Sequence, residues 1–187
     1  MTATSLPDRQ QRLLELVRGC VFQGTVTLAS GKTSDFYVDG RLMTLTGEGS
    51  ALLGEVILER ARALGATAIA GPTTGACPLV TAAGVLAYQA GESYTLSYVR
   101  SAPKGHGLQK AVEGPPLSAA DRVLMVEDVV TSGGSVLRAV ERLQEDTGAK
   151  VLVVLCVVDR EAGGAAAFAE AGVPLEALFT KGQVRGE

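Results

Sequence analysis

Tryptophan is absent from this sequence, phenylalanine and tyrosine each occur four times, and there is a single histidine. No stretch reaches the roughly 18 consecutive uncharged apolar residues that a membrane-spanning helix needs. The amino-terminal stretch, MTATSLPDRQQRLLELVRGC, also lacks the continuous apolar core of a signal peptide. The sequence therefore predicts a protein that neither spans a membrane nor is secreted by an ordinary signal.

Cysteine is scarce, and an excess of positive charge is missing. Cys20, Cys77 and Cys156 lie far apart and form no C-x-x-C pair, which argues against a disulfide framework and a zinc site. The 17 basic residues are scattered among 20 acidic ones, for a formal net charge of -3, so no basic face is expected to hold a nucleic-acid backbone. We expect a cytoplasmic protein that acts on small molecules, with no nucleic-acid or membrane partner.

Apolar residues and glycine are abundant. Hydrophobic residues make up 47% of the sequence, and glycine occurs 23 times. This composition is typical of α/β proteins built from Val, Leu and Ala. Because 187 residues can bury one good core and do not require two, we expect a single domain over 1–187.

Strand and helix patterns alternate along most of the chain. They predict strands at 67–70, 93–100, 122–127 and 151–158, and helices at 79–89 and 135–146. Upstream they predict a helix that begins near Ser5, strands at 25–28 and 35–39, and a helix at 48–64. Such alternation indicates a parallel sheet flanked by helices, whose ligands bind outside the carboxyl ends of the strands.

The stretch 123–135, VLMVEDVVTSGGS, joins an apolar strand to two adjacent acids and a loop of Thr, Ser and Gly. A helix that begins near Ser135 leaves unsatisfied N–H groups at its first turn, which attract a phosphate. The glycine pair lets the backbone fold closely around an anion, and the hydroxyl groups add donors. The stretch therefore predicts a phosphate site.

The two acids, Glu127 and Asp128, need a different partner. The chain contains neither G-x-x-x-x-G-K-[ST] nor G-x-G-x-x-G, so the ordinary nucleotide fingerprints are missing. Vicinal sugar hydroxyls can each donate a hydrogen bond to a carboxylate, so we interpret the stretch as a ribose 5-phosphate site. The plainer alternative is that Asp128 caps a turn that the glycines permit.

VLMVEDVVTSGGS resembles the phosphoribosyl pyrophosphate (PRPP) signature of the type I phosphoribosyltransferases. LASGKTSDFYVDGR (28–41), YVRSAPKGHG (98–107) and VVDREAGG (157–164) resemble the orotate-using members of that family over nearly the whole chain. The resemblance implies an α/β fold with a parallel sheet core over 46–187 and a small N-terminal hood over 1–45. It also implies a pentosyltransferase that converts orotate and PRPP to orotidine 5'-monophosphate and pyrophosphate in pyrimidine biosynthesis.

The resemblance assigns roles residue by residue. PRPP binding falls on Arg100, Lys104, His106, Glu127, Asp128, Val129, Val130, Thr131, Ser132, Gly133, Gly134 and Ser135. Orotate binding falls on Phe36, Tyr37, Thr131 and Arg160, and catalysis on Lys104, His106 and Asp128. Mg²⁺ is the implied cofactor, held mainly through PRPP, with Glu127 and Asp128 in indirect contact. The plainer alternatives are core packing for Phe36 and a surface ion pair with Asp159 for Arg160.

The segment 101–118 has neither a helical nor a strand period, and it is longer than most structureless loops in compact domains. Residues 100–114 carry three Lys or Arg and one Glu, a net charge of +2 in an acidic protein. We expect a mobile cationic lid over an anionic substrate. The family resemblance implies that Lys104 and His106 reach the pyrophosphate in the neighbouring subunit of a homodimer, although a lone histidine is often merely structural or exposed.

The chain departs from the family pattern at three positions. Ala29, the Thr73-Thr74-Gly75 loop and Ser101 stand where many members carry a lysine. We expect Arg100, Lys104 and Mg²⁺ to carry more of the charge, with Lys32 a candidate substitute. The alternative functions are a purine phosphoribosyltransferase and a non-catalytic PRPP-sensing regulator.

Overall fold

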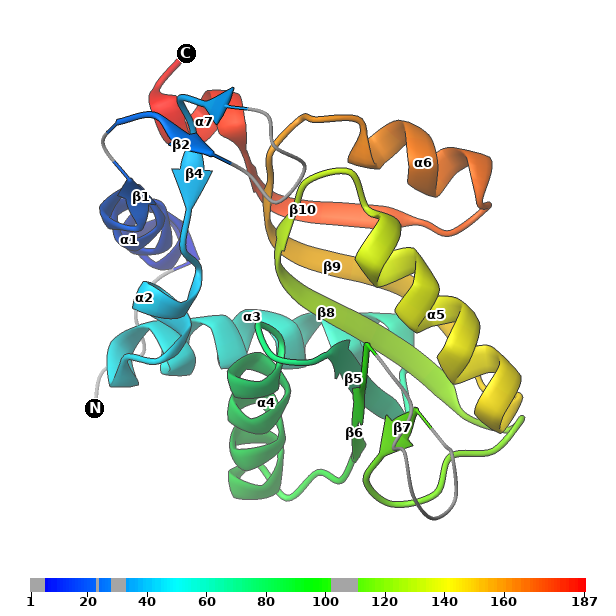
Figure 1. Cartoon of the computed structure of the whole chain (residues 1–187). Helices are drawn as coiled ribbons and strands as arrows, with labels where there is room; N and C mark the ends of the chain where they lie inside the picture. Colours follow the sequence, from blue (N-terminus) through cyan, green and yellow to red (C-terminus); the bar gives the residue numbers. More distant parts are fainter. Residues whose placement is uncertain (1–5, 23, 28–32, 102–110) are drawn as a thin grey trace.

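The computed structural model describes residues 6–22, 24–27, 33–101 and 111–187. A six-stranded sheet forms its centre, in the order β10-β9-β8-β5-β6-β7. Its strands are β5 (Ala68–Pro72), β6 (Thr95–Val99), β7 (Val112–Glu113), β8 (Arg122–Val130), β9 (Lys150–Asp159) and β10 (Leu175–Thr180). All neighbours pair in parallel except β7, which is antiparallel to β6. The predicted parallel sheet is confirmed (Figure 1).

The central strands are apolar on both faces because helices cover both sides. Along β8, Leu124 and Val126 pack into one buried cluster with α3 (Gly47–Leu64) and α4 (Cys77–Gln89). The alternate residues Val123 and Met125 pack into a second cluster with α5 (Gly134–Thr147) and α6 (Gly164–Glu170). Successive side chains of a strand point to opposite faces, so an unbroken apolar run serves both clusters.

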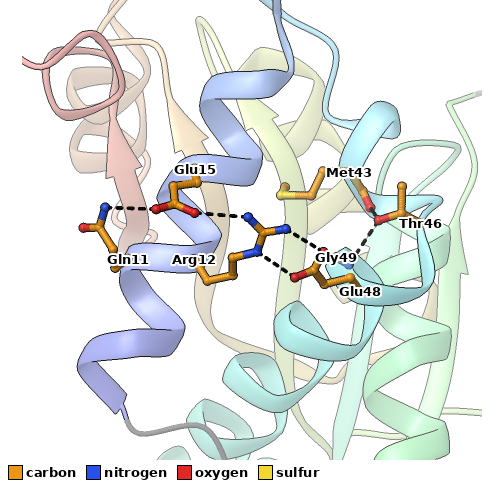
Figure 2. A network of polar contacts seen from close by, with 7 residues as sticks. All are labelled: Gln11, Arg12, Glu15, Met43, Thr46, Glu48 and Gly49. Carbon is orange, nitrogen blue, oxygen red and sulfur yellow. Dashed lines mark hydrogen bonds and ion pairs between the residues drawn. The ribbon is translucent and has the colours of Figure 1, made fainter.

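The helix ends follow ordinary capping chemistry. The hydroxyl of Thr46 accepts a hydrogen bond from the Gly49 N–H at 3.1 Å and so begins α3. Gly65, with a φ of 60°, ends the same helix. Beside this cap, the guanidinium of Arg12 bonds both carboxylate oxygens of Glu48, at 2.7 and 2.9 Å (Figure 2). These bonds tie the first helix to the start of α3.

The N-terminal unit is built from short elements. They are α1 (Leu6–Gly19), β1 (Val21–Phe22), β2 (Val26–Thr27), β3 (Thr33–Ser34), β4 (Tyr37–Val38) and α2 (Arg41–Thr44). The last helix, α7 (Lys181–Arg185), joins them: Arg18 donates to the Val184 carbonyl at 3.0 Å, and Arg185 pairs with Asp35 at 2.8 Å. Residues from both ends of the chain therefore form one structural unit.

Several predicted boundaries were wrong. The strand expected at 122–127 continues to Val130, because its backbone pairs with β9 as far as Asp159. The segment 101–118, expected to lack structure, contains β7. The strand expected at 35–39 is limited to β4, which pairs with β1, and the strand expected at 25–28 corresponds to β2, which pairs with β3. In the part of the chain that the structure describes, no helix is long and apolar enough to cross a membrane.

Candidate functional site

A cavity of about 380 Å³ opens at the carboxyl ends of β5, β6 and β8, where the parallel topology predicts a ligand site. Five segments converge on it. Its lining residues are Arg41, Pro72, Thr73, Thr74, Gly75, Val99, Arg100, Ser101, Glu127, Asp128, Val129, Ser135, Arg138, Ala139 and Arg142. Loops from separate parts of the sequence thus surround the acid pair.

The two acids lie near the end of β8 and differ in environment. Glu127 is only 8% exposed, and its Oε1 accepts a hydrogen bond from the Asp128 N–H at 3.1 Å. Burial, and next the negative charge of Asp128, raise the pKa of Glu127 well above the usual carboxyl range. Asp128 is more open, and its Oδ1 accepts from the Val129 N–H at 2.8 Å. Asp128 is therefore the more accessible carboxylate for a ligand.

Two glycines press against the carboxylate of Asp128. A Cβ atom on Gly40 would lie 2.7 Å from Oδ2, and one on Gly75 would lie 2.6 Å from Oδ1. Neither distance leaves room for a methyl group. The backbones before α2 and after β5 therefore both contact this carboxylate and restrict its orientation.

The loop after β8 leads into the start of α5. Gly133 is the N-cap of α5 and has a φ of 79°, a conformation that favours glycine. A Cβ at this position would also lie only 2.9 Å from the Phe168 ring. The Arg138 Nη1 lies 3.4 Å from the position of a Cβ on Gly134 and adds positive charge to the first turn. The first turn of α5 is thus suited to an anion.

The expected PRPP residues are only partly gathered around the cavity. Its lining includes Arg100, Glu127, Asp128, Val129 and Ser135. Val130 is 1% exposed and packs in the core, so its side chain does not face a ligand. Thr131, Ser132, Gly133 and Gly134 form the connection from β8 to α5 beside the cavity. Lys104 and His106, like Lys32 and Ala29, lie outside the described residues.

The expected orotate residues lie at the neighbouring strand ends. Arg160, just after β9, donates from Nη1 to the Thr131 hydroxyl at 3.3 Å and from Nη2 to the Phe36 carbonyl. Burial lowers the pKa of Arg160, and Tyr37 opposes this effect. The Phe36 ring is 1% exposed and has the Lys181 ammonium 5.7 Å from its centroid, so Phe36 offers this site its backbone. Tyr37 is partly buried beside it.

Three cavity arginines were missed by sequence reasoning. Arg138 and Arg142 follow Gly134 at intervals of four residues, so helical spacing alone could have placed them on the face of α5 that lines the cavity. Arg41 gave no comparable signal, because only the tertiary fold brings α2 to this rim. The Arg142 guanidinium also donates to the Arg100 carbonyl at 3.0 Å and to that of Ser101.

Glu127→Gln is expected to raise the thermal stability of the protein above neutral pH. The folded-state pKa of Glu127 is raised above its unfolded value, so its stabilising contribution is present at acidic pH and is lost as pH rises through the folded pKa. Glutamine does not titrate and keeps an oxygen for the Asp128 N–H. Thermal unfolding at pH 5 and pH 8 measures the difference. A variant whose advantage over wild type does not grow with pH would contradict this assignment.

The comparisons with known proteins agree with this geometry. Residues 51–167 match the family model of the phosphoribosyl transferase domain. The orotate phosphoribosyltransferase of Thermosynechococcus vestitus is 47% identical over 94% of this chain and 92% of its own. A crystal structure of orotate phosphoribosyltransferase from Mycobacterium tuberculosis H37Rv, in complex with Fe(III) dicitrate, is 37% identical and has a TM-score of 0.80 over 94% of this chain and 98% of its own.

A second structure of the Mycobacterium tuberculosis protein, in complex with PRPP, is 32% identical, with a TM-score of 0.76 over 95% of this chain and 99% of its own. The resemblance read from the sequence is thereby confirmed. This chain belongs to the phosphoribosyl transferase domain family and, within it, to the orotate phosphoribosyltransferases.

Proposed function

We propose that the protein transfers the 5-phosphoribosyl group of PRPP to orotate, which yields orotidine 5'-monophosphate and pyrophosphate for pyrimidine biosynthesis. One observation carries the proposal. The acid pair near the end of β8 is followed by a short connection to the first turn of α5, and Thr131 in that connection bonds to Arg160, which follows β9. A site for a sugar phosphate and a site for a carboxylate are thus adjacent on one rim.

Different residues of the site bind the different parts of the two substrates. The first turn of α5 binds the 5-phosphate, and the carboxylate of Asp128 accepts hydrogen bonds from the ribose hydroxyls. The planar guanidinium of Arg160 binds the orotate carboxylate through two hydrogen bonds. The ring nitrogen of orotate then lies within reach of the anomeric carbon.

The reaction is a displacement at that carbon. A bond forms from the orotate nitrogen to C1 of the ribose, and the bond from C1 to the pyrophosphate oxygen breaks. Pyrophosphate leaves with the electron pair and takes up the proton that the orotate nitrogen loses. Positive charge develops on the ribose ring and negative charge on the leaving group. Arginines around the cavity stabilise the leaving group electrostatically, and no nucleophilic side chain is needed.

We also propose Mg²⁺ as the cofactor. Among the described residues, no group of three or more His, Cys, Asp or Glu side chains is placed to hold a metal ion. The carboxylates of Asp128 and Glu127 are hard oxygen donors, which suits an ion held mainly by phosphate oxygens, with the protein as a minor contributor. Bound Mg²⁺ would neutralise charge on the departing pyrophosphate.

A spectrophotometric assay tests the proposal. Loss of orotate absorbance should require both PRPP and Mg²⁺ and should release pyrophosphate. Hypoxanthine and adenine, offered in place of orotate, test the purine alternative. Turnover of either purine in preference to orotate, or no turnover of any base, would refute the proposed reaction.

A homodimer is part of the proposal. Leu42, Leu45, Val85 and Tyr88 are large apolar side chains that α2, α4 and their ends leave exposed. Between these helices lies a shallow hollow lined by Cys77, Pro78, Ala82 and other residues. Because large exposed apolar patches are rare on monomers, we assign this surface to a second copy of the chain. Light scattering of the purified protein measures the mass directly.

We place the protein in the cytoplasm, which its free cysteines support.

Lys104→Ala is expected to lower turnover more than about tenfold without a change in folding. Lys104 belongs to a segment that carries excess positive charge in an acidic protein, and a cation there would stabilise the departing pyrophosphate. Steady-state kinetics with saturating orotate and PRPP measure the effect, and circular dichroism monitors folding. Normal turnover in the purified variant would remove Lys104 from the proposed machinery.

A further inference from the structure

Positively charged side chains are unevenly distributed around the cavity. Four arginines line it in the described part of the chain: Arg41, Arg100, Arg138 and Arg142. The loop 72–75, which forms one wall beside Asp128, is Pro-Thr-Thr-Gly and contributes no charged side chain. A diphosphate bound at that wall would need positive charge from elsewhere.

Three of these arginines also have contacts away from the uncharged wall. Arg138 lies over the first turn of α5, where the 5-phosphate is proposed to bind. Arg142 donates to the carbonyls of Arg100 and Ser101. Arg100 lies 3.7 Å from the Glu113 carboxylate across the β6–β7 pair. Arg41 is the cation that reaches the cavity from the N-terminal unit, beside the uncharged wall.

The backbone holds Arg41 close to the acid pair. Gly40, its neighbour, packs against Oδ2 of Asp128, while Gly75 of the uncharged wall packs against Oδ1 of the same carboxylate. Arg41 and the 72–75 loop are therefore adjacent to the same side chain. The pKa of Arg41 is raised mainly by its contact with Asp39 and, to a minor degree, by the negative charge of Asp128.

Asp39 holds the guanidinium of Arg41 in place. The Nε and Nη2 atoms each donate to a different oxygen of Asp39 at 2.8 Å, a two-point contact that fixes the plane of the group. This contact uses one edge of the guanidinium and leaves Nη1 for another acceptor. The side chain is 58% exposed, so a ligand can approach it.

We propose that Arg41 binds the diphosphate of PRPP and the pyrophosphate product. This inference rests on the proposed function and deepens it. In PRPP the 5-phosphate and the diphosphate leave the ribose ring from opposite ends. With the 5-phosphate at α5 and the ribose hydroxyls at the acid pair, the diphosphate extends toward Gly75 and Arg41. Arg41 supplies the positive charge that the 72–75 loop lacks.

Fragments of the substrate test this assignment. Pyrophosphate with Mg²⁺, and ribose 5-phosphate alone, are each titrated as competitive inhibitors against PRPP. Arg41→Gln is expected to weaken pyrophosphate at least about tenfold, as for the loss of a charge-assisted contact, and to leave ribose 5-phosphate within about twofold. Arg138→Gln is expected to show the opposite pattern.

Two further variants separate direct contact from other effects. Arg41→Gln leaves Asp39 without its ion pair, whereas the double variant D39N/R41Q removes both charges. If Arg41 contacts the diphosphate directly, the affinity of the double variant for pyrophosphate should remain as low as that of Arg41→Gln. Arg41→Lys keeps the charge without the fork and is expected to fall between wild type and Arg41→Gln. Arg12→Gln is the matched control, since Arg12 also has a two-point contact with one carboxylate, that of Glu48, away from the cavity (Figure 2).

Each outcome has one meaning. Unchanged pyrophosphate affinity in Arg41→Gln, in protein that still consumes orotate, would overturn the inference and leave the proposed function standing. Recovery of wild-type affinity in D39N/R41Q would also overturn it, because the loss would then come from the unpaired Asp39. A wild-type protein that binds neither PRPP nor pyrophosphate would refute the inference together with the proposed function.

Discussion

Arg160→Ala is expected to weaken orotate binding at least about a hundredfold and to leave PRPP binding within about twofold. Two charge-assisted hydrogen bonds from one planar guanidinium to the orotate carboxylate would be lost, and each contributes about 1.5–3 kcal/mol when it is shielded from water. Arg160 is held for this role by the Thr131 hydroxyl and the Phe36 carbonyl. Calorimetric titration of each ligand separately measures the two affinities.

Controls distinguish this role from a structural one. Arg160→Lys keeps the charge but loses the fork, so its orotate affinity should lie between those of wild type and Arg160→Ala. Arg62→Ala removes a guanidinium whose hydrogen bonds within the described part of the chain go to the surface carboxylate of Glu92, and it should change neither affinity. If Arg160→Ala lost both ligands together, Arg160 would be holding the rim in shape and not recognising orotate.

Gly75→Ala is expected to lower kcat/KM for PRPP about a hundredfold. The added methyl group would lie 2.6 Å from Oδ1 and 2.8 Å from Cγ of Asp128, so the carboxylate must move away from the ribose hydroxyls. A carboxylate contributes to binding and turnover only when it is held in the right position, so this movement of Asp128 should remove much of its contribution. Steady-state kinetics with PRPP as the varied substrate measure it.

Gly19→Ala is the matched control, because a Cβ on Gly19 meets no atom within 4 Å and the residue lies in the last turn of α1. It should leave kcat/KM unchanged. The thermal midpoint of Gly75→Ala should also stay close to that of wild type, since the site lies at the rim of the sheet. Wild-type kinetics in Gly75→Ala would show that the position of Asp128 does not control the reaction.

The sequence predicted the core of the fold well because both faces of the sheet are covered. Alternate residues of β8 serve the two buried clusters, and the apolar run of VLMV reports this directly. The end of β8 was misplaced because Glu127 and Asp128 look like the start of a loop. Their backbone nevertheless continues the pairing with β9, while their side chains differ in exposure.

Residues that only tertiary contacts bring together could not be predicted. Arg41 reaches the cavity because Gly40 packs on Asp128, which is distant in sequence. The C-terminal elements β10 and α7 were also missed, since the segment LEALFT alternates weakly and α7 has only five residues. The proximity of Thr131 and Arg160, by contrast, follows from their places after adjacent parallel strands.

The short pairing of β6 with β7 holds Arg100 and Ala111 together at the edge of the sheet. The Arg100 N–H donates to the Ala111 carbonyl at 2.9 Å, and α5 secures both sides, through Arg142 on Arg100 and through Asp146 on the Ala111 N–H. Because Arg138 on the same helix lines the cavity, α5 supports this edge of the sheet and the ligand site together. A substitution that displaces α5 should therefore affect both.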